Sequence, residues 1–247
     1  MTASSTSYVA AIAEHSLQFA EVANGNFNVS VPHCPGWNVA DVVLHLVSVH
    51  WLWSTIVNEQ LLEPPDDSRR PPAPARTALV ATFLDGADRL VQVLSSSDQD
   101  APVWTWAPNH NTVAFVTRHQ VQEIVVHHWD VANAVGRPFV IAPAVATDAI
   151  EEFLTVSVSS DVDPADPPAP ALGGSFGLRC TDADAAWTIR DGAVAGTTLW
   201  VRGLDDSVPV LESTASDALL WLYGRAHLSS DVPNELLKRF RALSFTN

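Results

Sequence analysis

Histidine and acidic residues recur at regular intervals in the middle of the sequence. In the segment RHQVQEIVVHHWD, His119, Glu123 and His127 are spaced four residues apart, and Asp130 follows three residues later. At about 100° of rotation per residue, such positions project from one face of a helix. Two imidazoles and a carboxylate suit zinc, whose catalytic sites keep one coordination position open. The spacing is therefore compatible with a metal site.

A single helix rarely closes such a site, so a further donor is expected from another helix. His45 is a candidate because it lies on a stripe of core-facing apolar residues in a second helical segment. A structural interpretation also fits these residues. His119, Glu123 and His127 can form a ladder of i,i+4 contacts that stabilises their helix by about a few tenths of a kcal/mol per pair. His45 can be a core histidine. The spacing leaves both interpretations open.

The elements that carry these residues are predicted from hydrophobic periodicity. Asn38 and Asp41 form a capping pattern at the start of the helix that holds His45. Gly136 and Pro138 end the helix that holds Glu123. Of the remaining histidines, His50 is expected at a helix edge and His128 on the surface. Helical spacing predicts helices over 7–23, 38–58, 76–94, 112–135 and, more briefly, 146–156.

The composition changes in the segment DVDPADPPAPALGG, which has the character of a loop. Short runs rich in β-branched and aromatic residues follow it, and helical spacing then returns. We therefore predict an α+β protein, with a four-helix bundle over 1–158 and a small α+β domain over 159–247. The expected strands cover 176–182, 186–191 and 197–203, and the expected helices cover 216–226 and 234–243.

Net charge and cysteine content limit the binding partners and the compartment that we expect for this protein. Thirteen Lys and Arg against 28 Asp and Glu give a net charge of −15, which repels nucleic acid and anionic membrane surfaces. No uninterrupted apolar run reaches the roughly 18 to 20 residues that a membrane-spanning helix needs. The two cysteines, Cys34 and Cys180, form no disulfide framework and no CxxC motif. A cytoplasmic protein without nucleic-acid or membrane partners is expected.

Three segments resemble the mycothiol-dependent maleylpyruvate isomerase family, within the DinB-like metal-binding helical bundles. They are CPGWNVADVVLHL at 34–46, EIVVHHWD at 123–130 and SDALLWLYGRA at 216–226. The resemblance implies that His45, Glu123 and His127 bind a divalent metal, most simply zinc. This sequence departs from the family at Gln122, where relatives often have histidine, and in having His119 and His128 where basic residues are expected. These departures concern the substrate pocket and leave the ligands in place.

The resemblance further implies mycothiol, the small thiol of actinobacteria, as co-substrate. A metal-activated thiolate would attack a small electrophile in an isomerase or S-transferase reaction. Asp130 would orient a ligand imidazole, or else be a helix-end charge. Arg225 would bind a substrate carboxylate through its planar guanidinium, or else lie on the surface of a C-terminal helix. Cys34 precedes a Pro-Gly turn, which favours a buried structural role.

Two other functions are also compatible with the sequence. A metal-bound water would make the protein a hydrolase of small amides or thiol conjugates. A structural metal would make it a non-catalytic protein that binds small molecules. The sequence does not indicate an oligomeric state.

Overall fold

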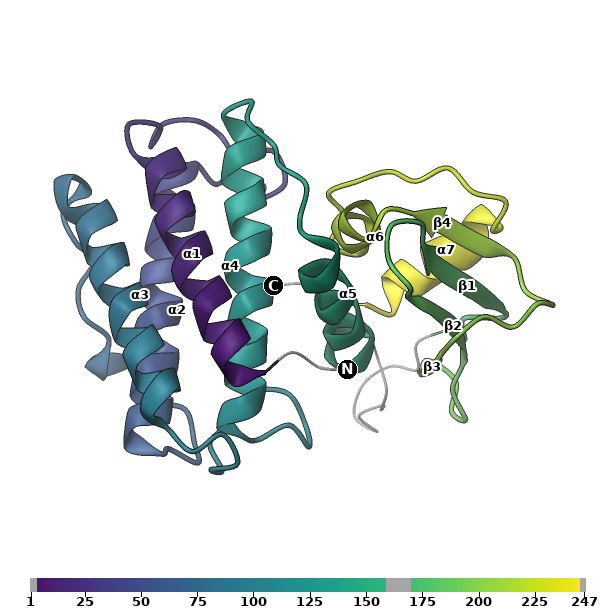
Figure 1. The fold of residues 1–247 in the computed structure, drawn as a ribbon, viewed down its shortest axis with the longest axis horizontal. Coiled ribbons are helices and arrows are strands. Elements are labelled where there is room, and N and C mark those ends of the chain that lie inside the picture. Colours follow the sequence, from purple (N-terminus) through teal and green to yellow (C-terminus); the bar gives the residue numbers. More distant parts are fainter. Residues whose placement is uncertain (1–3, 159–169, 245–247) are drawn as a thin grey trace. The chain divides into compact units, whose positions relative to one another are not determined.

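The computed structural model describes residues 4–158 and 170–244. Contacts divide the chain into two compact units, one ending at Val140 and the other beginning at Ile141. The first unit is helical and the second combines a sheet with helices, so the predicted α+β class is confirmed (Figure 1). The sequence predicts a domain boundary after residue 158. The contacts instead group the helix at 143–152 with the second unit, because that helix packs against a later helix of the same unit.

The first unit is a bundle of four long helices that run side by side (Figure 1). In it α1 packs against α3 and α4, and α2 packs against α3 and α4. Two short 3-10 helices, Asp67–Arg69 and Arg76–Ala78, lie in the connection between α2 and α3. The helix predicted from residue 76 therefore begins as a 3-10 turn. The bundle helices are α1 Ser5–Ala23, α2 Val39–Glu59, α3 Leu79–Ser96 and α4 Val113–Ala134.

Local capping fixes the ends of the two helices that carry the candidate ligands. The Asn38 side chain accepts hydrogen bonds from the N–H groups of Ala40 and Asp41, and the Asp41 carboxylate accepts one from the Asn38 N–H at 2.8 Å. This is the predicted capping box. Thr112 caps α4, and Gly136 follows that helix with a φ of 76°, a conformation that favours glycine. The registers of α2 and α4 are thus set close to the site.

Large apolar side chains fill the middle of the bundle. The rings of Phe19 and Phe83 lie 4.9 Å apart between α1 and α3, and both are fully buried. By length and composition α2 is apolar enough to cross a membrane, but 56% of its most apolar window is buried inside the protein. Core helices of soluble proteins pass the same test. The apolar character of α2 is therefore accounted for by its packing against α3 and α4.

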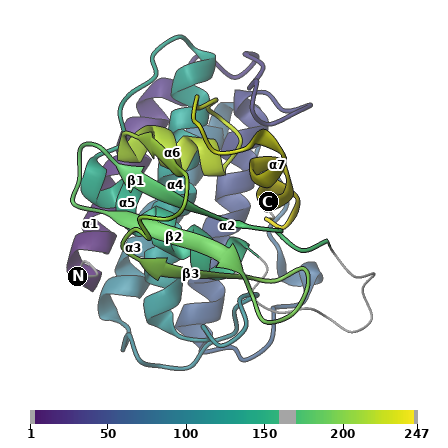
Figure 2. The same cartoon turned by 90° about the vertical axis from the view of Figure 1, so that its right-hand side faces the viewer.

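The second unit contains a four-stranded sheet in the order β3-β2-β1-β4. Figure 2 shows β3, β2 and β1 as successive strands of this sheet. Strands β1, β2 and β3 are antiparallel neighbours, whereas β4 pairs in parallel with β1. The three predicted strands are present, and β4 is an addition to them. A π-helical turn, Phe153–Ser157, extends α5, the first helix of this unit. The elements are α5 Pro143–Glu152, β1 Ser175–Cys180, β2 Ala186–Asp191, β3 Thr198–Arg202, β4 Val210–Ser213, α6 Ala215–Leu222 and α7 Asn234–Ala242.

One face of the sheet forms the core of this unit. The register pairs Phe176 with Ile189 and Leu178 with Trp187, so four buried side chains share that face. The ring of Phe240 in α7 lies 5.2 Å from that of Phe176. Burial of these apolar side chains holds α7 against the sheet.

Candidate metal centre

The structure brings His45, Glu123 and His127 together inside the helical bundle. His45 comes from the first half of α2, while Glu123 and His127 are one turn apart on α4. The distance from His45 Nε2 to Glu123 Oε1 is 2.8 Å, and that from His127 Nε2 to the same oxygen is 3.7 Å. One potential ligand atom from each residue lies within 4.8 Å of the other two. The side chains thus converge from two helices.

This arrangement fits a divalent ion. Two donors on a tetrahedral zinc with bonds of about 2.0–2.1 Å stand roughly 3.3 Å apart, a separation that follows from the geometry alone. The observed separations of 2.8 and 3.7 Å lie on either side of this value. Two imidazole nitrogens and one carboxylate oxygen are also a donor set of catalytic zinc sites. Because 30% of the His45 side chain and 19% of the Glu123 side chain are exposed, a further ligand can approach the cluster.

A buried carboxylate contacts the imidazole of His127. Asp130 Oδ2 lies 3.2 Å from His127 Nδ1, and the Asp130 side chain is fully buried. The Cys34 thiol donates a hydrogen bond to the same oxygen at 3.5 Å. A proton on Nδ1 directed at Asp130 leaves Nε2 facing Glu123. The contact between Cys34 and Asp130 was not predicted, because residues 96 positions apart meet only through the fold.

Charge complementarity defines the cluster in the metal-free state. Burial opposes charge on His127, but hydrogen bonds to Asp130 and Cys34 and the charge of Glu123 outweigh it and raise the pKa of His127 to about 10. Burial also opposes charge on Glu123, yet the hydrogen bond from His45 and the nearby imidazoles lower its pKa to about 2. The metal-free site is therefore an ionic cluster of a carboxylate and a protonated imidazole.

Other candidates from the sequence lie elsewhere. His119 follows the same helix face but packs among aromatic rings, stacked on Phe115 with centroids 5.7 Å apart, and it does not join the ligand cluster. The predictions for His50 and His128 are wrong, because both side chains are buried. His128 lies in the bundle with its Nδ1 3.2 Å from that of His15. Helical periodicity did not predict the burial of His50 and His128, because α2 and α4 carry apolar residues on several of their faces.

Arg225 belongs to the second unit. It was expected within a helix over 216–226, but α6 ends at Leu222 and Gly224 turns the chain with a φ of 75° before Arg225. The half-buried guanidinium donates a hydrogen bond to the Tyr223 carbonyl at 2.7 Å and lies 5.5 Å from the Tyr223 ring centroid. Arg225 therefore lies on the turn that follows α6, and not on a surface helix as the alternative prediction had it. The role of Arg225 in binding substrate stays a prediction.

Comparison with known proteins identifies the family. Residues 9–132 match the mycothiol maleylpyruvate isomerase N-terminal domain. This match covers half of the chain and includes all three candidate ligands. The chain belongs to this family, and it is therefore an enzyme of the maleylpyruvate isomerase-like class.

Two solved structures share the fold. One is a mycothiol-dependent maleylpyruvate isomerase, with a TM-score of 0.60 and 12% identity over 94% of this chain and 98% of that one. The other is a histidine-to-alanine mutant of a mycothiol-dependent maleylpyruvate isomerase, with a TM-score of 0.59 at the same identity and coverage. No curated protein sequence matches the chain significantly.

Proposed function

We propose that this enzyme is a mycothiol-dependent isomerase in which His45, Glu123 and His127 hold a divalent metal ion. The observation that carries the proposal is the convergence of these three side chains from α2 and α4 onto donor separations that suit such an ion. Zinc is the ion we favour, from the combination of two nitrogen donors and one oxygen donor. Family membership supports the thiol partner.

The ion would lower the pKa of a thiol that binds to it and so supply a thiolate near neutral pH. The protein residues hold and orient the site. Asp130 accepts the hydrogen bond from His127 Nδ1 and fixes the direction of Nε2. The ring of Trp37 lies 5.3 Å from that of His45, and 37% of Trp37 is exposed. Trp37 therefore forms an apolar edge beside the exposed side of the cluster.

The substrate we propose is a small electrophile with a carbon–carbon double bond conjugated to a carbonyl group. The thiolate sulfur adds to one alkene carbon, and the displaced electron pair moves onto the conjugated carbonyl. Rotation about the resulting single bond and return of the electron pair expel the thiolate, which leaves the trans double bond. Atoms are conserved and the thiol is regenerated. An S-transferase shares the same first attack but keeps the new carbon–sulfur bond, and a proton from water then neutralises the carbanion formed by the addition.

For Arg225 we propose a role in holding a substrate carboxylate. A guanidinium presents two parallel donors that match the two carboxylate oxygens. Arg225 Nη1 donates a hydrogen bond to the Tyr223 carbonyl, which restricts the orientation of the arginine side chain. A cytoplasmic location, where low-molecular-weight thiols stay reduced, agrees with the two free cysteines.

A thiol titration tests the proposal. Protein in which cobalt replaces zinc should develop a sulfur-to-metal charge-transfer band on addition of mycothiol, with release of a proton near neutral pH. The Glu123→Gln protein should show neither signal. Mycothiol should bind more tightly than glutathione, since a pocket shaped for a sugar-bearing thiol leaves polar groups unpaired when the sugar is absent.

Two results would redirect the assignment. If saturating mycothiol gives no band and no proton release, the thiol mechanism is rejected. Hydrolysis of small amides or thiol conjugates by the same protein would then support a metal-bound water as nucleophile. Tight metal binding without any turnover would instead support a binding protein.

A further inference from the structure

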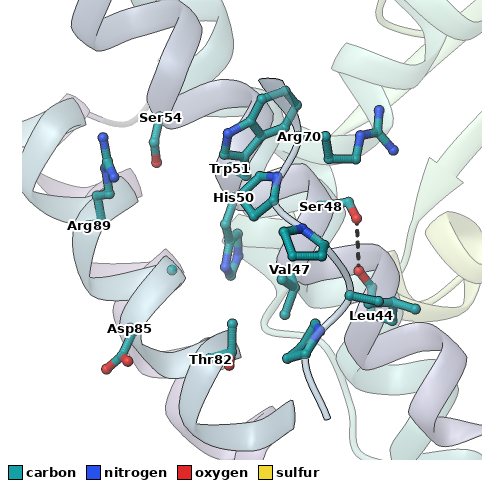
Figure 3. A pocket seen from close by; sticks show the side chains of 15 residues that line it. Leu44, Val47, Ser48, His50, Trp51, Ser54, Arg70, Thr82, Asp85 and Arg89 are labelled. Carbon is teal, nitrogen blue, oxygen red and sulfur yellow. Dashed lines mark hydrogen bonds between the residues drawn. The ribbon is translucent and has the colours of Figure 1, made fainter. Parts of the chain in front are cut away.

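A cavity separate from the metal centre lies in the first unit, between α2, α3 and the proline-rich connection between them (Figure 3). Its volume is about 370 Å³, which falls in the range of small-molecule sites. Much of its wall is apolar, with Leu44, Val47 and Trp51 from α2 facing the proline-rich segment. None of the three candidate metal ligands lines it.

Helix geometry places this cavity on the other side of α2 from the metal centre. At about 100° per residue, Val47 is rotated roughly 200° from His45, and Trp51 roughly 240°. Both residues line the cavity, whereas the imidazole of His45 contacts Glu123. A molecule in the cavity would therefore be separated from the metal centre by the body of α2.

The inner wall carries two buried polar groups. His50 and Ser54 lie four residues apart on α2, and their exposed fractions are only 2% and 1%. Both residues line the cavity. The His50 ring lies close to the Phe83 backbone, but His50 Nδ1 and Ser54 Oγ have no hydrogen-bond partner by geometry among the described residues. Buried polar groups nearly always find a partner in folded proteins. Two such groups on one wall indicate a ligand with a polar atom at this depth.

The His50 ring favours a neutral polar atom over a charged one. Burial lowers the pKa of His50 to about 4, so the imidazole is neutral at physiological pH. A neutral imidazole offers one N–H donor and one nitrogen acceptor, and the Ser54 hydroxyl can both donate and accept. A hydroxyl group on the ligand matches this pair.

Two arginines and one aspartate lie on the rim of the cavity. Arg70 and Arg89 lie on opposite sides of His50 and Trp51 in Figure 3. Arg70 pairs with Asp67, but the exposed Arg89 makes no hydrogen bond or ion pair with a described residue. Asp85 also lines the rim, so with Arg70 paired to Asp67 these charges cancel, and Arg89 is the rim arginine that has no ion pair with a described residue. An anionic group on the ligand can pair with Arg89.

We propose that the cavity binds a small, mainly apolar molecule that carries one carboxylate and one neutral hydroxyl group. Its apolar body packs against Trp51 and Val47, and its carboxylate pairs with Arg89. Its hydroxyl group reaches His50 and Ser54. Aromatic hydroxy acids are the chemical class that combines these features. This site is independent of the proposed thiol chemistry and does not require the metal.

Calorimetric titration with 6-hydroxy-2-naphthoate tests the site. The probe should bind the zinc-loaded protein and the chelator-treated protein with similar affinity, because the cavity contains no metal ligand. Arg89→Gln should weaken binding at least about tenfold, the loss expected when a charge-assisted contact is removed. Arg137→Gln, which neutralises another exposed arginine of the same unit, is the matched control and should bind as the wild type does.

Two further variants test whether the probe binds inside the cavity. Val47→Trp should abolish binding by filling the cavity. Ser54→Ala should remove the preference for 6-hydroxy-2-naphthoate over 2-naphthoate, which lacks the hydroxyl group.

The proposal is overturned if the probe does not bind at millimolar concentration, or if Arg89→Gln and Arg137→Gln behave alike. Loss of binding on chelation would place the carboxylate at the metal centre and would equally refute it. Because Arg89 is exposed, Arg89→Gln keeps the test decisive even where Val47→Trp disturbs folding.

Discussion

The protonation of His127 predicts how zinc affinity depends on pH. Hydrogen bonds to Asp130 and Cys34 help to raise its pKa to about 10, so the metal-free imidazole carries a proton across the neutral range. A metal ion requires the neutral ring, and one proton must leave for each ion bound. The apparent affinity should therefore rise about tenfold per pH unit, or about 100-fold between pH 6.5 and 8.5. This corresponds to about 2.7 kcal/mol.

Competition with a chromophoric chelator at a series of pH values measures this slope. Calorimetry in two buffers of different ionisation enthalpy should give about one proton released per ion from His127 near pH 8. Asp130→Asn removes the carboxylate that helps to raise the pKa, so it should flatten the slope and reduce the proton count. Glu21→Gln, an exposed change on α1, is the control and should keep both. A zinc affinity independent of pH in the wild type would refute the reasoning.

The raised pKa of His127 also makes the stability of the metal-free protein depend on pH. Because the pKa of His127 is raised in the folded state, its contribution is fully present below the ordinary value of about 6.5 and is lost as the pH rises through about 10. The lowered pKa of Glu123 has the opposite sign, so its contribution is present above the ordinary value and is lost as the pH falls towards 2. Denaturant unfolding without metal should therefore show a loss of stability on the alkaline side that zinc removes.

Further substitutions test the site and the fold. Glu123→Gln should lower bound zinc well below one ion per chain by elemental analysis, and should abolish the gain of about 2.7 kcal/mol expected at a free zinc concentration 100 times the dissociation constant. Stoichiometric zinc in that variant would contradict the ligand assignment. Arg225→Lys should retain zinc and thermal stability but weaken turnover of a carboxylate substrate, because the charge remains while the paired donors are lost; unchanged kinetics would remove Arg225 from the site. Asn38→Ala should lower the free energy of unfolding by about 1 kcal/mol through loss of the α2 cap, and a change near zero in chemical denaturation would show that the cap is dispensable. Phe83→Ala should cost about 3–5 kcal/mol, since it leaves a cavity beside Phe19, and a loss below 1 kcal/mol would indicate that the bundle repacks.

Several features followed from local sequence alone. Asn38 and Asp41 predicted the start of α2, because a capping box involves only residues three positions apart. The four-residue interval between Glu123 and His127 placed them on one face of α4, a consequence of helical pitch. Three of the four strands were also predicted, since turn residues separate runs of β-branched and aromatic side chains. The apolar stripe of its helix made His45 a candidate partner for this face, and the family resemblance favoured that interpretation over a core histidine.

Other features depend on contacts between distant segments. The sequence did not predict β4, whose four residues gain their strand character by pairing in parallel with β1. It also assigned His50 to a helix edge, whereas the packing of α3 and the proline-rich connection encloses that ring in a cavity. Helical periodicity gives the direction of a side chain from its own axis. It does not say which neighbour covers that direction.

The candidate metal centre combines both kinds of information. The sequence determined the types of donor, their order and the helix faces that present them, because these depend on chemistry and helical pitch. Only the tertiary structure decided that His45 Nε2 lies 2.8 Å from Glu123 Oε1 and that Cys34 reaches Asp130. These contacts join residues 78 and 96 positions apart. Such separations are set by the packing of whole helices, to which side chains throughout the bundle contribute.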